Sequence, residues 1–190
     1  MLYLASASPR RQELLRQLGV AFEVLVSDVD ERREPRETPP QYVLRVARDK
    51  ASRGLAIARE WGLPAYPVLG ADTEVVLGDE VFGKPADRAH GIAMLQRLQG
   101  RTHEVLSVVV LLDVHGERNA LSRSLVTFSP MTAADIERYW DSGEPLGKAG
   151  GYAIQGRAAA FISRLEGSYS GVMGLPLFET AQLLHPMRPV

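Results

Sequence analysis

The spacing of apolar residues along this chain alternates between the short period of β-strands and the longer period of amphipathic helices. Residues 2–5 form an apolar run that predicts a strand, and leucines recur at helical spacing over residues 9–18. Ser8 is the expected N-cap of this helix, Pro9 its first residue and Gly19 its left-handed stop. By the same reasoning we expect strands at 22–26, 67–77, 81–82 and 161–165, and helices at 38–59, 87–98, 132–143 and after residue 176.

Two long runs rich in β-branched residues, 105–114 and 121–128, are joined around the short segment 115–117. This pattern is typical of an antiparallel hairpin. Strands that alternate with helices precede the hairpin, so the sheet should combine helix-connected strands with an antiparallel hairpin. The sequence therefore predicts an α/β fold with a mixed, twisted sheet and flanking helices.

The composition places the chain among globular proteins. With 190 residues, 45% of them hydrophobic and 24% charged, it suits one domain that spans residues 1–190. No run approaches the roughly 18 consecutive apolar residues of a membrane span, and the start lacks a secretory pattern, so we expect no membrane association and a cytoplasmic location. A net charge of −1 gives no general attraction for nucleic acid, which favours a small-molecule partner.

The chain contains no cysteine, and its four histidines lack the close spacing of metal-binding pairs. Disulfides, thiolate nucleophiles and cysteine-based metal sites are thereby excluded. A bound metal would need oxygen ligands, which favours Mg²⁺ or Mn²⁺.

The turn between the first strand and the first helix has the chemistry of an anion site. It presents the hydroxyl of Ser8 and the guanidinium groups of Arg10 and Arg11 at a helix N-terminus. Free backbone N–H groups and the helix dipole favour a phosphate there, and arginine adds bidentate donors. The alternative is an ordinary strand-to-helix turn with solvated arginines.

Single charged residues recur at positions where the pattern predicts buried or tightly turned backbone. Lys50 continues the apolar stripe of the 38–59 helix, so its ammonium must reach solvent or meet an anion. Asp72 ends the buried part of the 67–77 strand, where it is either a functional carboxylate or the cap of a turn. Lys84 lies in a Gly-Lys-Pro corner, and Asp30 and Glu31 lie in a charged loop that either is solvated or reaches a cleft.

The motifs of several common enzyme classes are absent from the sequence. It contains no GxxxxGK[ST], no GxGxxG after a strand and no GxSxG. The mixture of cations and carboxylates suits a triphosphate held by lysine and arginine, with acids that bind a divalent ion and activate water. Asp72 is the expected base for such a hydrolysis.

Six motifs, in order along the whole chain, resemble the Maf family of cytoplasmic nucleotide pyrophosphatases. They are SASPRR (6–11), ARDKA (47–51), LGADT (69–73), GKP (83–85), KAGGYAIQG (148–156) and GSYSGVMGLPL (167–177). The resemblance implies two lobes around a central cleft in a Maf/ITPase-like fold, and often a homodimer. It also implies cleavage of a nucleoside triphosphate to the monophosphate and pyrophosphate with a divalent cation, Mg²⁺ or Mn²⁺.

The same resemblance assigns roles to individual residues. Asp72 matches the proton acceptor, and Glu31 and Asp72 would lie near the metal. Lys50 and Lys84 would lie near the phosphates. The residues that would contact substrate are Ser8, Arg10, Arg11, Thr73 and Gln155, of which Arg10, Thr73 and Gln155 resemble the branch of the family that cleaves dTTP and UTP.

Two positions depart from the family pattern. Glu74 stands where an apolar residue is usual, and it either adds an acid near the metal or faces solvent. Gly147 replaces a common aspartate and removes a carboxylate partner of Lys148. Two alternatives to dTTP and UTP hydrolysis stay open: a pyrophosphatase for other or modified nucleotides, and a nucleotide-binding regulator of cell division with little turnover.

Overall fold

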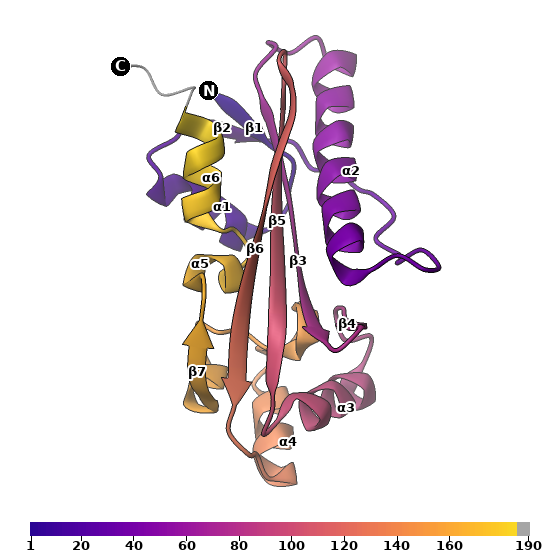
Figure 1. Ribbon diagram of the computed structural model, residues 1–190, viewed down its shortest axis with the longest axis vertical. Coiled ribbons are helices and arrows are strands. Elements are labelled where there is room, and N and C mark those ends of the chain that lie inside the picture. Colours follow the sequence, from indigo (N-terminus) through magenta and orange to yellow (C-terminus); the bar gives the residue numbers. More distant parts are fainter. Residues whose placement is uncertain (186–190) are drawn as a thin grey trace.

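The computed structural model describes residues 1–185, which form a seven-stranded mixed sheet with helices on both faces (Figure 1). The strand order is β2-β1-β3-β5-β6-β7, and β4 pairs with β3. β1 is parallel to β2 and β3, and the other pairs are antiparallel, which confirms the predicted mixed sheet. The strands are β1 (Leu2–Leu4), β2 (Phe22–Val24), β3 (Val68–Leu77), β4 (Glu80–Phe82), β5 (Thr102–Asp113), β6 (Gly116–Phe128) and β7 (Ile162–Glu166).

The helices cover different parts of this sheet. In Figure 1, α2 lies along one side of the upper half of β3 and β5, α1 and α6 lie on the other side, and α3 and α4 gather at the lower end. No helix within residues 1–185 has the length and apolarity needed to cross a membrane. The α-helices are α1 (Pro9–Gln17), α2 (Pro39–Glu60), α3 (Arg88–Leu98), α4 (Ala133–Asp141), α5 (Tyr169–Met173) and α6 (Leu177–Leu184), and the 3₁₀ helices are η1 (Ala149–Gly151) and η2 (Arg157–Ala160).

Helix starts follow the capping signals of the sequence. The Ser8 side chain accepts a hydrogen bond from the backbone of Arg11, and Gly19 has a φ of 67° just after the end of α1. Thr38 and Gln41 form a capping box at the start of α2. These local interactions confirm the predicted positions of α1 and α2.

Close packing of α2 on β3 fixes the relative positions of Lys50 and Asp72. A Cβ atom at Gly70 would lie 2.3 Å from the carbonyl oxygen of Ala47 and 2.8 Å from the Cβ of Ala51, so only glycine fits there. Lys50 lies on the same turn of α2, and Asp72 is two residues beyond Gly70 on the same face of β3. The close approach therefore holds the lysine above the carboxylate.

One edge of β3 is only partly covered. β1 pairs with β3 at Val68 and Leu69, and β4 pairs with it over residues 75–77. Residues 70–74 therefore face a gap between β1 and β4. Because β1 leads directly into the Ser8 turn, this gap lies next to the N-terminus of α1.

The structure corrects some predicted boundaries. β2 ends at Val24, two residues earlier than expected, and the strands of the hairpin are longer than predicted. The segment 167–176 was expected only to open the last helix, but it contains the separate helix α5, which Ser168 caps. A five-residue helix is too short to show an apolar period, which is why the pattern missed it.

Candidate active site

A cleft of about 610 Å³ opens at the gap in the edge of β3. This volume is in the range of small-molecule sites. The cleft is lined by all nine residues to which the resemblance assigns a role: Ser8, Arg10, Arg11, Glu31, Lys50, Asp72, Thr73, Lys84 and Gln155. They come from α1, α2, β3 and four loops, so the fold gathers them from distant parts of the chain.

The turn before α1 forms one wall of the cleft. Ser6 Oγ accepts a hydrogen bond from the backbone N–H of Ser8, 3.2 Å away, and this contact shapes the turn. Arg11 Nε donates to the carbonyl oxygen of Gly174 at 2.8 Å, which ties α1 to the loop after α5. Burial lowers the pKa of Arg11, and the negative charge of Asp72 acts against that shift. The wall thus combines a helix N-terminus with a fixed guanidinium group, as expected for an anion site.

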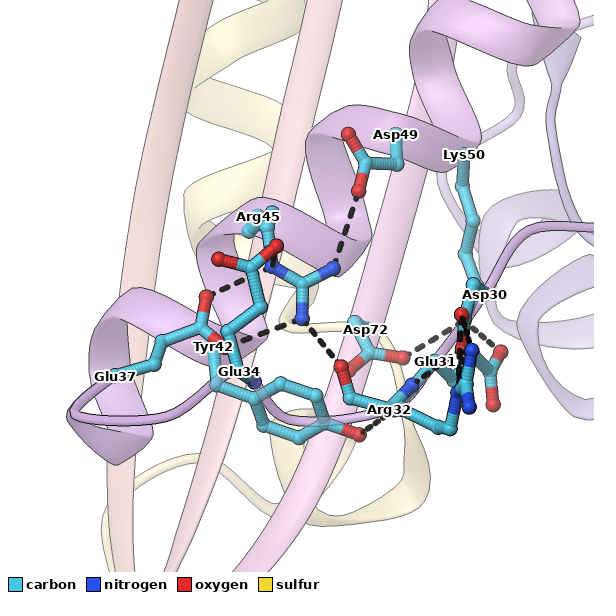
Figure 2. Close-up of polar contacts among 10 residues, drawn as sticks. All are labelled: Asp30, Glu31, Arg32, Glu34, Glu37, Tyr42, Arg45, Asp49, Lys50 and Asp72. Carbon is cyan, nitrogen blue, oxygen red and sulfur yellow. Dashed lines mark hydrogen bonds and ion pairs between the residues drawn. The ribbon is translucent and has the colours of Figure 1, made fainter.

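A buried lysine lies at the base of the cleft. Lys50 is 7% exposed, and its Nζ lies 2.8 Å from Asp72 Oδ1 and 2.7 Å from Glu31 Oε1 (Figure 2). The exposed Lys84 reaches the other oxygen of Glu31 at 3.2 Å. Burial alone would raise the pKa of Glu31, but the hydrogen bonds and charges of Lys50 and Lys84 lower it below its ordinary value. The lysine on the apolar stripe therefore meets anions, and does not extend to solvent.

Contacts between α2 and the charged loop 28–38 place Glu31 in the cleft. The hydroxyl of Tyr42 donates to the backbone carbonyl of Glu31 at 2.6 Å, and Arg45 donates to Glu37 at 2.8 Å and to the carbonyl of Arg32 at 2.8 Å (Figure 2). The loop is thus attached to α2 at Glu31 itself and at two positions after it.

Asp30 does not belong to the site. Its carboxylate pairs with the neighbouring Arg32 at 2.7 Å, and both side chains are exposed. Of the two acids that were candidates in this loop, the structure brings only Glu31 to the cleft.

Asp72 and Glu74 lie on the face of β3 that α2 covers, whereas Thr73 lies on the other face. Thr73 shares a hydrogen bond with Ser107, 2.9 Å away between the hydroxyl oxygens. Glu74 is 7% exposed and lines the cleft, so the solvent-facing alternative for this residue is wrong. Burial and the negative charges of Asp72 and Glu31 raise the pKa of Glu74 to about 8.

The loop that carries Gln155 forms a second wall, which meets α1 at Arg10. Arg10 Nη1 donates a hydrogen bond to Gln155 Oε1, which leaves the amide nitrogen of this exposed glutamine free to donate. Glu144 holds the loop from behind, because its carboxylate accepts the backbone N–H groups of Arg157 and Ala158 at 2.8 and 3.2 Å. Where the family aspartate is replaced by Gly147, Lys148 Nζ donates to the backbone carbonyl of Glu144 at 2.6 Å.

Three residues that support this arrangement were missed in the sequence: Tyr42, Arg45 and Glu144. Tyr42 lies on the buried side of α2 two turns before Lys50, so the apolar stripe could have indicated that it points toward the same region. No local signal identifies the contacts by which Arg45 and Glu144 hold the loops, because each of these contacts is made to backbone groups of an irregular segment.

The cleft offers oxygen donors of the kind that a hard divalent cation prefers. Asp72 Oδ2 is buried and has no hydrogen-bond partner among the described residues. Among residues 1–185, no group of three His, Asp or Glu side chains is arranged so that it could hold a metal ion without further ligands. The donors fit an ion held by one or two carboxylates and completed by water or by phosphate oxygens of a ligand.

The arrangement can bind a polyanion and deliver a carboxylate to it. Cationic groups from α1, α2 and the loop after β4 lie around a buried acid, and the neutral amide of Gln155 lies next to Arg10. Such a cleft suits a ligand that is anionic at one end and presents hydrogen-bonding edges at the other.

Comparisons with known proteins agree with the resemblance. Residues 1–187 match the model of the Maf-like protein family. Curated relatives named dTTP/UTP pyrophosphatase include that of Cupriavidus pinatubonensis (strain JMP 134 / LMG 1197), 57% identical with 98% of this chain and 96% of the relative covered. Those of Bordetella avium (strain 197N) and Xanthomonas campestris pv. campestris are 58% and 59% identical, with 96% and 97% of this chain and 93% and 97% of the relatives covered.

Among solved structures, the Staphylococcus aureus Ham1 protein aligns with 98% of this chain and 96% of its own. At 10% identity and a TM-score of 0.49, this likeness is too remote to support a conclusion.

Proposed function

Because this chain belongs to the Maf-like protein family, we propose that it is a nucleoside triphosphate pyrophosphatase that hydrolyses dTTP and UTP to the monophosphate and pyrophosphate. The relatives from C. pinatubonensis, B. avium and X. campestris carry the name dTTP/UTP pyrophosphatase. The observation that carries the proposal is the buried Lys50–Asp72 pair, which shares one cleft with the anion site at the start of α1.

In this proposal the triphosphate lies along the cationic wall. Arg11 and the free backbone N–H of Arg10 at the start of α1 bind phosphate oxygens, and Lys84 approaches them from the loop after β4. Ser8 contributes its place in the turn, since its hydroxyl already caps the helix. These groups neutralise the charge that develops on the departing pyrophosphate.

Asp72 is the proposed general base. Lys50 occupies its Oδ1 and fixes the orientation of the carboxylate, which leaves Oδ2 to accept a proton from the attacking water. Water in this position would attack the phosphorus nearest the nucleoside, and the bond to the leaving pyrophosphate would break. The proton stays on Asp72 until it is released to solvent.

Glu31 and Asp72 would hold a divalent cation, Mg²⁺ or Mn²⁺. When bound, such an ion neutralises phosphate charge and polarises the phosphorus–oxygen bonds. The pairing of Glu31 with two lysines keeps its carboxylate ionised next to the phosphate site.

Gln155 is the proposed reader of the base. Arg10 binds its amide oxygen, so the amide nitrogen is free to donate to O4 of thymine or uracil. Thr73 contributes indirectly, because its hydroxyl also lies 3.3 Å from the carbonyl oxygen of Gly174, the same oxygen that anchors Arg11.

The reaction can be tested by identifying the products from dTTP in the presence of Mg²⁺ and of EDTA. We expect dTMP and pyrophosphate with Mg²⁺, and release of orthophosphate would contradict the proposed cleavage. Rates on a panel of other and modified triphosphates distinguish a dTTP and UTP pyrophosphatase from one that prefers other nucleotides. Binding of dTTP without turnover would indicate a regulatory protein. The homodimer and the cytoplasmic location stay predictions.

Replacement of Asp72, the proposed general base, tests its role directly. We expect Asp72→Asn to lower kcat roughly 100-fold or more with a smaller effect on KM, because the amide cannot accept the proton. Asp79→Asn is the matched control, since this exposed residue of the β3–β4 turn lies outside the cleft. Equal kcat in Asp72→Asn and the unmodified protein would contradict the assignment.

A further inference from the structure

Glu74 is a buried acid in the cleft for which the reaction outlined above has no use. It lies two residues after Asp72 on β3, so both side chains extend from the same face of the strand. Glu74 is 7% exposed and Asp72 is 5% exposed. Each has one buried oxygen, Glu74 Oε2 and Asp72 Oδ2, without a hydrogen-bond partner in residues 1–185.

The neighbouring lysines do not satisfy these two oxygens. Lys50 binds Asp72 Oδ1 and Glu31 Oε1, and Lys84 binds Glu31 Oε2. Both oxygens of Glu31 therefore have partners, whereas the unpaired oxygens belong to the two acids deeper on β3. Buried side-chain oxygens without a hydrogen-bond partner are rare in proteins, because the loss of their contact with water is not compensated.

We infer that Glu74 is a further metal ligand, and that its Oε2 joins the carboxylates of Asp72 and Glu31 around the divalent cation of this cleft. The inference rests on the proposed function and deepens it. Two carboxylates from alternate residues of one strand supply hard oxygen donors, and water or phosphate oxygens complete the coordination. The pair binds the cation before the nucleotide arrives.

Binding of Mn²⁺ in the absence of nucleotide tests this inference. The electron paramagnetic resonance signal of free Mn²⁺ gives its Kd for the unmodified protein and for Glu74→Gln, which keeps the size of the side chain and removes its charge. We expect one Mn²⁺ per chain in the unmodified protein and a Kd raised about tenfold or more in Glu74→Gln. The matched control is Glu104→Gln on β5, whose carboxylate pairs with Arg123 outside the cleft, and its Kd should be unchanged.

Two results would overturn the inference. One is a Glu74→Gln protein that is folded by circular dichroism and binds Mn²⁺ within twofold of the unmodified protein. The other is an unmodified protein that binds no Mn²⁺ without nucleotide, which would indicate that Glu74 is simply a protonated, buried acid. Neither result affects the proposed function, which depends on whether dTTP yields dTMP and pyrophosphate.

Discussion

Removal of the buried ammonium group should cost this protein much of its stability. Lys50→Met keeps the length and the apolar stem of the side chain but deletes Nζ, which lies 2.8 Å from Asp72 and 2.7 Å from Glu31. Asp72 would then be a buried carboxylate without a hydrogen-bonded cation beside Glu74, a second buried acid.

The magnitude follows from the burial of each partner. Breaking a buried ion pair by removal of one partner costs about 3–5 kcal/mol, and Lys50 and Asp72 are 7% and 5% exposed. The Glu31 side chain is 37% exposed, so loss of that contact adds less than about 1 kcal/mol. We therefore expect a decrease of about 3–5 kcal/mol in the free energy of unfolding, or a fall in Tm on the order of 10 °C.

Urea unfolding of a double-mutant cycle measures the effect. Asp72→Asn in the Lys50→Met background removes the unpaired charge, so the double variant should be roughly 2 kcal/mol more stable than the sum of the single variants predicts. Lys84→Met is the matched control, because its side chain is 62% exposed and pairs only with Glu31. It should cost less than about 1 kcal/mol.

The reasoning would be refuted by either of two results. A Lys50→Met protein as stable as Lys84→Met would show that the buried pair gives no net stabilisation. Additive effects in the double-mutant cycle would show that Lys50 and Asp72 do not interact in the folded protein.

Two further predictions concern the core around the site. Burial lowers the pKa of His103 to about 4, so the imidazole stays neutral in the folded protein at a pH where it is protonated in the unfolded chain. The free energy of unfolding should therefore fall by about 3 kcal/mol in total as the pH falls from about 6.5 to 4. Unfolding by urea across this range should depend less on pH in His103→Phe, and an unchanged dependence would contradict the assignment. At Gly91 of α3 a Cβ would lie 1.8 Å from the ring of Trp140 in α4, so Gly91→Ala should lower the free energy of unfolding by about 1–3 kcal/mol. Equal Tm values for Gly91→Ala and the unmodified protein would show that α3 and α4 separate easily.

Much of the fold could be predicted because its signals are local. The capping residues Ser8 and Thr38 start helices where expected, and the long β-branched runs form the hairpin of β5 and β6. The boundaries that were wrong lie where tertiary contacts decide. The hairpin strands continue through Glu104 and Arg118, which are polar, because each pairs along the whole length of its neighbour.

The candidate site was predictable in part for the same reason. The apolar stripe of α2 placed Lys50 inside. Asp72 was expected where the buried part of its strand ends, but β3 stays buried as far as Val76, so Asp72 lies in the middle of the strand. The burial of Glu74 follows from its alternation with Asp72, once the α2 side of β3 is known to be covered. The position of Glu31 could not be derived, because it depends on the contacts of Tyr42 and Arg45 with an irregular loop.

The strands β5 and β6 run through most of the height of the molecule, from the level of α2 and α6 at its upper end to that of α3 and α4 at its lower end, and β3 lies beside β5 over its upper part (Figure 1). The two ends are therefore joined by continuous ladders of hydrogen bonds, and not by a flexible linker. Rotation of one end as a rigid body would require these ladders to bend. We expect entry of a ligand to depend on movement of the loops 28–38 and 146–157, with the strand that carries the acids as a fixed floor.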